Sequence, residues 1–411
     1  MSWLSRKRLP PMGHEKILVC AAALLAAAPV LAAEYYVQPT ASIAAENDSN
    51  LDLNPGGMHA VQGYMGDAAA LFSISTPESD TSIRPHIDYR NYPTDSADNR
   101  LEEYLDFNSY YKSQRSKASV YFGFERRDEI NAELNAAFYN PYGPVLPTNP
   151  ETGRTINGAT RTSYILMPDY SYGLTPLTAV GVSAIVQQFQ YSPTNTYDAI
   201  DFRYFQAKAY LRFALDQKDD MTVGAYGSKY QATEFDSTAT AGGVSLQLDT
   251  NWSPLLTTTA SVQYQHTTVE DSLPTLFKTT VSPWGANVAV TYKVAASQFR
   301  LNGGRVITPS GGGGIYVNDQ VQLQYERDFT QRLSLTAAAV ALRNHGVTSN
   351  VSGDDRTYVR PVVQVKYLLT QTFSVQGGYQ YMWEKYQINP DGALNNRVYI
   401  QFTYQGLGRQ W

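Results

Sequence analysis

The chain is almost free of cysteine, which removes a set of structures and chemistries at the outset. The single cysteine, Cys20, lies inside an apolar stretch near the N-terminus, and every residue after it is free of thiols. Disulfide bonds, cysteine-ligated zinc and thiol nucleophiles are therefore excluded from the rest of the chain.

Charged residues are also scarce. They make up 17% of the 411 residues, with a net charge of −5, where about a quarter is usual for a soluble protein. A slightly negative net charge does not indicate a basic surface for a polyanion, so we expect no nucleic-acid partner. The polarity comes from uncharged side chains and from 31 tyrosines. A soluble all-β protein can show this composition, but it is more typical of a membrane barrel with a wet interior.

Long apolar runs are missing after residue 33, since none approaches the roughly 18–20 residues of a membrane-spanning helix. The only apolar run is Ile17–Ala32, which follows four basic residues, Arg6, Lys7, Arg8 and Lys16. With small residues at its end, this pattern predicts a signal peptide over residues 1–33. Residues 34–411 then form a single domain. Export without a helical anchor leaves the periplasm, secretion or an outer-membrane barrel.

What the sequence does contain is alternation. In RPVVQVKYLLTQTFSVQGGYQYMW (360–383), every second residue from Pro361 is apolar or aromatic, and the residues between them are mostly polar. The same period of two recurs along the chain, and it indicates strands whose two faces meet different environments. Pro361 cannot donate to a strand ladder, so we expect it at the outer rim or at a bulge.

The connections between these strands are of two kinds that alternate. Short turns are predicted at 174–177, 216–220, 253–256, 330–333 and 369–372. Long polar loops are predicted at 46–57, 91–99, 268–275, 307–314, 344–355 and 387–396. This wiring is typical of an up-and-down antiparallel barrel with short periplasmic turns and long outer loops. The count is about 18 strands, starting near Tyr35. Sixteen is the alternative, because 221–240 and 296–320 are weakly patterned.

Three observations favour a transmembrane barrel over a soluble sandwich or propeller. No blade-type repeat is visible. The polar strand faces are too numerous to form a dry core, and a closed barrel is the only β structure that pairs every backbone group in hydrocarbon. Aromatic residues also gather at predicted strand ends, as interface girdles require: Tyr89, Trp252, Trp284, Tyr292, Tyr325, Tyr367, Trp383 and Tyr404.

Two loops invite specific hypotheses. The largest connection runs from 128 to 159, and it either folds inward to narrow the pore or packs as a surface loop. Both alternatives stay open. The segment ITPSGGGG (307–314) is predicted to be an outer loop whose glycines serve as a flexible linker.

Candidate lumen-lining residues follow from strand parity. They are Arg84, Asp88, Asp106, Lys112, Tyr121, Glu125, Lys208, Tyr210, Arg212, Arg300, Arg360, Lys366 and Glu384. Such charges either tune selectivity, with a mild preference for anionic solutes, or form compensating ion pairs that fix barrel shape. Tyrosines with the same parity suit a saccharide, because the ring offers an apolar face and a polar tip, but they also fill space in any barrel: Tyr104, Tyr110, Tyr121, Tyr210 and Tyr399.

Signs of an enzyme are weak. His86 and Asp88 share a strand face with Arg84, a pairing that could serve as a general base, but no serine accompanies them at a recognisable spacing. His59, His266 and His345 fall in or near outer loops. No metal-ligand spacing, P-loop or dinucleotide-binding glycine pattern is present. We therefore predict a protein that is not an enzyme, with no cofactor and no metal. A barrel-embedded hydrolase is the least favoured alternative.

The first predicted strand, YYVQPTASIAAENDSNLDL (35–53), with its Asp/Asn-rich end Glu46-Asn47-Asp48-Ser49-Asn50, resembles a known family. Together with the tyrosine-rich strands and the length, it is similar to the outer-membrane β-barrel porins associated with exopolysaccharide biosynthesis clusters. The resemblance implies passage or export of polysaccharide across the outer membrane of a Gram-negative cell. It carries over no catalytic residue.

The final strand departs from the common pattern of a terminal phenylalanine. VYIQFTY (398–404) is followed by QGLGRQW, so the terminal aromatic is either Trp411 or the pair Phe402 and Tyr404. The predicted partners are outer-membrane lipid, a saccharide or polysaccharide solute and the outer-membrane assembly machinery, with a homo-oligomer left open. The predicted function is a porin-like channel for saccharide or polysaccharide, and the alternative is a general diffusion porin for small solutes.

Overall fold

The structure is a computed structural model, and it describes residues 33–55, 59–95, 98–129, 159–192, 199–232, 237–271, 277–312, 314–346, 355–387 and 391–410. The predicted signal peptide, apart from residue 33, and residues 130–158 of the largest loop lie outside these ranges. Among the described residues, no helix is long and apolar enough to cross a membrane.

Nearly all of the described chain is β-strand. The strands are β1 (Glu34–Asp48), β2 (Val61–Ser75), β3 (Ser79–Asn91), β4 (Arg100–Lys112), β5 (Ser116–Asp128), β6 (Thr160–Gly173), β7 (Thr178–Ser192), β8 (Phe202–Ala214), β9 (Asp219–Ala232), β10 (Ser237–Ser253), β11 (Leu256–Asp271), β12 (Phe277–Val281), β13 (Trp284–Val294), β14 (Ser297–Pro309), β15 (Ile315–Asp328), β16 (Leu333–Gly346), β17 (Arg356–Leu368), β18 (Phe373–Tyr386), β19 (Ala393–Gln405) and β20 (Arg409–Gln410).

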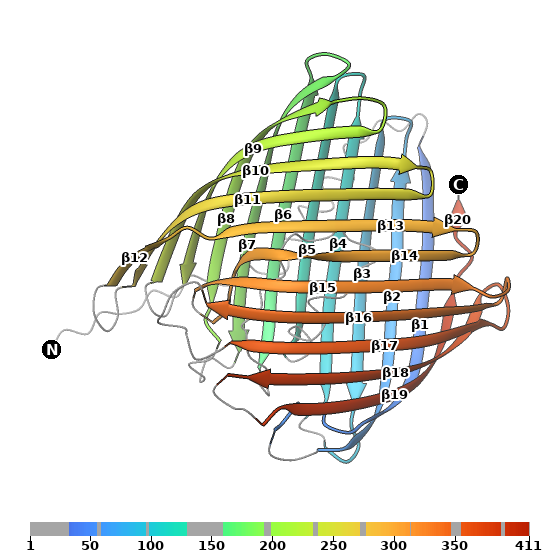
Figure 1. Ribbon diagram of the computed structural model, residues 1–411. Coiled ribbons are helices and arrows are strands. Elements are labelled where there is room, and N and C mark those ends of the chain that lie inside the picture. The colour runs from blue at the N-terminus through green and yellow to red at the C-terminus, as the bar shows by residue number, and fades with distance from the viewer. Residues whose placement is uncertain are drawn as a thin grey trace, which may run out of the picture.

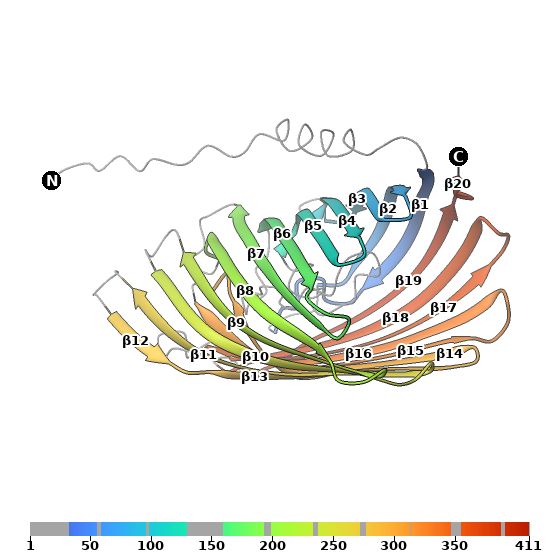
Figure 2. The ribbon, with the colours of Figure 1, turned by 90° about the horizontal axis from the view of Figure 1, so that it is seen from above.

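The strands form one closed antiparallel barrel (Figure 1). Sequence neighbours pair with each other, and β1 pairs with both β2 and β19, so the first and last strands meet at a seam (Figure 2). Strands β12 and β13 both continue along β11, and β19 and β20 both continue along β1. Each of these two pairs is one interrupted wall strand, so the wall has 18 strands and confirms the predicted count.

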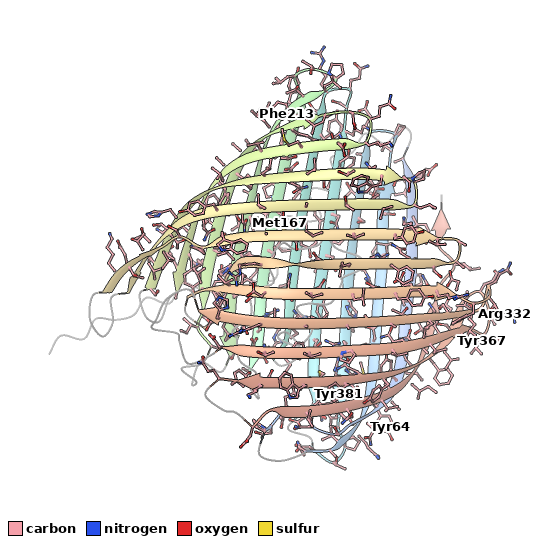
Figure 3. All side chains as sticks on the ribbon, in the orientation of Figure 1. Tyr64, Met167, Phe213, Arg332, Tyr367 and Tyr381 are labelled. Atoms are coloured by element: carbon pink, nitrogen blue, oxygen red, sulfur yellow. The ribbon has the colours of Figure 1, made fainter. Side chains whose placement is uncertain are left out.

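The outer face of the wall is apolar, as the alternation predicts. Exposed aliphatic side chains occupy the middle of the strands, for example Ile43, Leu246 and Val288. Exposed aromatic side chains flank them, and Figure 3 shows Tyr64 projecting near the end with the long loops and Tyr367 near the end with the short turns. An aliphatic band between two aromatic girdles is the surface that a barrel presents to lipid.

The predicted turns coincide with the observed ones within a residue or two. Leu174 N donates to Thr178 O over 2.9 Å, and Leu369 N donates to Phe373 O over 2.9 Å, which closes two of the short turns. Throughout, "turn end" denotes the end of the barrel with these short turns, and "loop end" the opposite one.

The expectation for Pro361 is wrong. It lies within β17, faces outward between Arg360 and Val362, and pairs in register with Ala339 of β16. Toward β18 the ladder skips residues 360 and 361 and resumes without a register shift. A missing N–H affects only one neighbouring strand, so a proline whose ring faces lipid needs no bulge. Pro85 and Pro168 interrupt their ladders in the same way.

Candidate functional site: a polar lumen narrowed from within

Inward-facing side chains enclose a cavity of about 890 Å³. Much of its lining comes from β8 to β14, and most of the lining residues carry an uncharged amide or hydroxyl group. Representative lining residues are Gln206, Gln247, Gln263, Asn287 and Asn302. Amides and hydroxyls both donate and accept hydrogen bonds. This wall, called here the neutral wall, can therefore solvate a polar solute without selecting a charge.

The opposite part of the lumen is charged. A group of inward-facing ion pairs lies near the loop end of β1, β3, β5, β6 and β17 to β19, and we call it the charged sector. Its members are Glu46 with Arg397, Asp88 with Arg90 (3.4 Å), Glu125 with Arg127 (3.2 Å) and Arg161 (3.5 Å), and Glu384 with Arg356 (2.8 Å). Opposite charges held this closely neutralise each other's field over the lumen.

The predicted lumen residues divide between these regions. Asp88, Glu125 and Glu384 are the acidic members of ion pairs in the charged sector, and Arg360 is buried beside them on β17. Sequence parity placed the carboxylates on the inner face, but it did not reveal their partners Arg90, Arg127, Arg161 and Arg356. Partners on other strands depend on register, which parity alone does not supply.

A second group of predicted residues lies deeper in the lumen. Tyr121 and Lys208 line the cavity. The Tyr121 hydroxyl donates to Asp106 Oδ1 over 2.9 Å, and Arg84 is the register partner of Asp106 on β3. These contacts join three neighbouring strands at one height.

The remaining predicted residues lie toward the turn end and are not brought together. Arg212 pairs with Asp220 at 2.6 Å, and Arg300 pairs with Glu326 at 3.4 Å. Lys112 is exposed opposite Lys117, and Lys366 lies opposite Gln376. The thirteen predicted lumen residues therefore do not form one site.

Several inward tyrosines lie along the wall across a glycine of the adjacent strand. Tyr210 is the register partner of Gly181, and a Cβ at Gly181 would collide with its ring. The Tyr210 hydroxyl continues across β7 to donate to Asp169 of β6, at 3.1 and 3.0 Å from its two carboxylate oxygens. The same arrangement joins Tyr226 to Gly243 and Tyr399 to Gly378. Glycine makes room for the ring, so the tyrosine coats the wall instead of projecting into the lumen.

Among the described residues, the loop end is narrowed by the paired ends of β14 and β15, residues 306–312 and 314–317, called here the inner hairpin. Residues 307–311 and 314–318 are buried on both strand faces, whereas a wall strand is buried on one. Figure 1 shows β11 and β12 extending beyond the outer ends of β14 and β15. The hairpin therefore leaves the wall and enters the lumen.

Hydrogen bonds hold the tip of the inner hairpin against β9 and the connection before β8. Tyr230 of β9 donates its hydroxyl to Ser310 O over 2.9 Å, and Ile200 N donates to Gly311 O over 2.8 Å. Four ladder spacings separate β9 from β14, which is about 19 Å along the wall. Tyr230 and Ile200 can therefore reach the hairpin tip only through the interior of the barrel.

An apolar cluster surrounds these bonds. Ile307, Ile315 and Val317 of the inner hairpin pack with Phe189 and Phe202, whose rings stack at 4.7 Å. Beside the cluster, Asp201 accepts the Tyr191 N–H over 2.8 Å, and burial raises the pKa of its carboxyl. The expectation that 307–314 is a flexible surface linker is wrong, since Gly311 and Gly314 are buried in this packed hairpin. The available signal was Ile315, Tyr316 and Val317, three consecutive apolar residues without alternation.

His86 has a structural environment. Its Nε2 contacts Asp67, and its ring stacks on Tyr104 with the centroids 4.8 Å apart. Asp88, its predicted partner, is instead paired with Arg90. The arrangement that motivated an embedded hydrolase is not formed by these residues.

No protein-family model matches the chain, and no curated protein matches it. Solved structures of similar topology exist. Pseudomonas aeruginosa OccK2 (OpdF), solved in complex with glucuronate, has 12% identity and a TM-score of 0.47, covering 91% of this chain and 98% of that one. P. aeruginosa OpdK has 10% identity and a TM-score of 0.46 (92% and 99%), and Acinetobacter baumannii OccAB3 has 9% and 0.46 (90% and 99%). Values this low carry no conclusion about solute.

The chain's own geometry defines its class. A closed 18-stranded wall has an apolar outer band, a polar interior and a narrowing built from its own strands. That combination is the architecture of a porin-like transmembrane channel.

Proposed function

We propose that this protein is an outer-membrane channel for small polar solutes. The observation that carries the proposal is the combination of an apolar exterior with a cavity of about 890 Å³, most of whose lining residues carry an uncharged amide or hydroxyl group. A soluble protein has no use for an aliphatic band around its whole circumference. A lumen rich in amides and hydroxyls supports permeation, because it offers hydrogen bonds to a solute without holding it tightly.

Saccharides of small size are the solute class that this lining suits best. Sugar hydroxyls donate and accept hydrogen bonds, as the amides of Gln247, Gln263 and Asn287 on the neutral wall do. The inward tyrosines add polar tips with apolar rings. The paired charges of the charged sector give little reason to prefer an ionic solute.

The inner hairpin supports a small solute over a polymer. It fills part of the loop end and is fixed to β9 and to Ile200 by hydrogen bonds. A polysaccharide chain would have to thread past it between the apolar cluster and the charged sector. Polysaccharide export, which the family resemblance implies, is the competing proposal.

Liposome swelling distinguishes the two proposals, because it compares how fast solutes of different size enter. We expect proteoliposomes to swell in monosaccharide and disaccharide solutions at rates that fall steeply with solute size, and to exclude polysaccharide. In planar bilayers the same protein should conduct ions, and oligosaccharides should reduce the current. Swelling or release with a polymer as solute would favour export, and absence of any conductance would overturn the channel itself.

A further inference from the structure

Two long loops at the loop end bring one histidine and three aspartates together. His59 and Asp52 belong to the β1–β2 loop, and Asp95 and Asp98 belong to the β3–β4 loop. His59 Nδ1 lies 3.5 Å from Asp52 Oδ2 and 4.0 Å from Asp98 Oδ2, and His59 Nε2 lies 3.2 Å from Asp95 Oδ2. The lumen and its proposed channel function make no use of this group.

The two ring nitrogens of His59 face different carboxylates. Asp95 faces Nε2 and can accept its proton, which leaves the Nδ1 lone pair pointing at Asp52 and Asp98. A lone pair facing two carboxylates is repulsive unless Nδ1 carries a proton or a metal cation lies between the three groups. Metal-binding histidines commonly donate the second ring N–H to a carboxylate, because this fixes the tautomer and strengthens the ligand.

The carboxylate of Asp98 supplies a second, independent observation. Its Oδ2 is sealed from solvent, and it makes no hydrogen bond within the described part of the chain. A buried carboxylate oxygen without a partner costs free energy. A cation bound between Asp52, His59 and Asp98, whose ligand atoms all lie within 4.8 Å of one another, would satisfy it.

Bonds and packing hold the described parts of these two loops together. Tyr92 is fully buried, donates its hydroxyl to Glu46 over 2.7 Å, and packs with Leu51 and Val61 of the other loop region. Leu51 N donates to His59 O over 3.4 Å. The ligand set is therefore held in place before any cation arrives, which lowers the cost of binding.

We propose that Asp52, His59 and Asp98 form a binding site for a divalent first-row transition-metal cation, with Asp95 as the carboxylate that orients the histidine. One imidazole nitrogen and two carboxylate oxygens are a donor set for zinc and its neighbours. Calcium and magnesium prefer sites made of oxygen alone. His59 is about 40% exposed and Asp52 and Asp98 are 17% and 18% exposed, so water can complete the coordination.

Calorimetric titration of the chelator-stripped, detergent-solubilised protein with zinc tests the site. We expect one equivalent to bind, a hundredfold excess of calcium to leave it bound, and cobalt to give visible absorption bands when it replaces zinc. His59→Ala should abolish binding, and Asp95→Asn should weaken it by about 10–100-fold.

His266→Ala is the matched control, because His266 is also exposed near the loop end, where its Nδ1 lies 3.1 Å from the Ser282 hydroxyl. It should bind zinc like the unmodified protein. Heat-dependent mobility in gels checks that each variant folds, and Asp98→Asn provides a second disruption. Zinc binding that survives both His59→Ala and Asp98→Asn, or its complete absence in the folded unmodified protein, overturns the proposal. Displacement by calcium would overturn the choice of metal.

Discussion

Arg356 and Glu384 show how a single side-chain pair supports the lumen wall. Both side chains are essentially buried, at 0% and 1% exposed, and two guanidinium nitrogens lie 2.8 Å from the same carboxylate oxygen. We predict that Glu384→Gln lowers the free energy of unfolding by about 3–5 kcal/mol, because it removes the carboxylate charge that pairs with a buried guanidinium. Denaturant titration in lipid vesicles, followed by tryptophan fluorescence, measures the change.

The matched control is Asp220→Asn, which breaks the Arg212 pair at a position where the arginine is 45% exposed. Exposed pairs contribute less than about 1 kcal/mol, so this variant should unfold almost like the parent. Equal effects of the two substitutions would show that burial does not govern these pairs.

Among structural elements, the inner hairpin depends most on particular residues, because buried apolar side chains hold it in the lumen. Ile307 and Ile315 lie in the apolar cluster that holds it against β7 to β11. We predict that Ile307→Asp releases the hairpin, because a carboxylate cannot remain in that cluster without a partner, and that single-channel conductance rises. Ile307→Val should leave the conductance unchanged, since it removes one methyl group at a cost of about 0.5–1.5 kcal/mol.

A shortened variant in which residues 306–317 are replaced by a two-residue turn gives a second measure that does not depend on the cluster. Its conductance should equal or exceed that of Ile307→Asp. If neither variant conducts more than the parent, the hairpin does not limit flow.

Predictable and unpredictable strands differ in what their two faces contact. Where one face meets lipid and the other meets water, alternation identifies the strand and the short turns identify its ends, as for Val363 and Val365 on β17. Residues 307–311 and 314–317 meet protein on both sides, so their alternation disappears and the sequence pattern weakens. This is the cause of the uncertainty over 296–320.

The site was less predictable than the wall. Parity placed Glu125 and Glu384 inside, but pairing with Arg161 and Arg356 follows from register across strands. The cluster around His59 joins two separate loops, His59 and Asp98 being 39 positions apart, so no local sequence spacing reveals it. Contacts of this kind become visible only when the barrel closes.

For the molecule as a whole, the balance of charge across the lumen has an electrical consequence. Each carboxylate of the charged sector is held by an arginine, and most residues of the neutral wall are uncharged, Lys208 being an exception. We predict a reversal potential close to zero in a potassium chloride gradient across a planar bilayer. The double variant Arg127→Gln and Arg161→Gln leaves Glu125 without a counter-charge, so the potential should shift toward that of a cation-selective channel. A strongly ion-selective parent would contradict the neutral lumen.

The departure of the inner hairpin from the wall also leaves a notch in the rim. The β13–β14 ladder ends at Ala286 and Arg305, and within the described residues β12 pairs with β11 alone. Backbone groups that face such a notch cannot lie in hydrocarbon, where nothing would satisfy them. Trp284, at the lower edge of the notch, faces outward with the Arg305 guanidinium 5.0 Å from its ring, a pair suited to the lipid headgroups. The inner hairpin that narrows the channel therefore also limits how deep the barrel lies in its bilayer, because the notch that it leaves must stay outside the hydrocarbon.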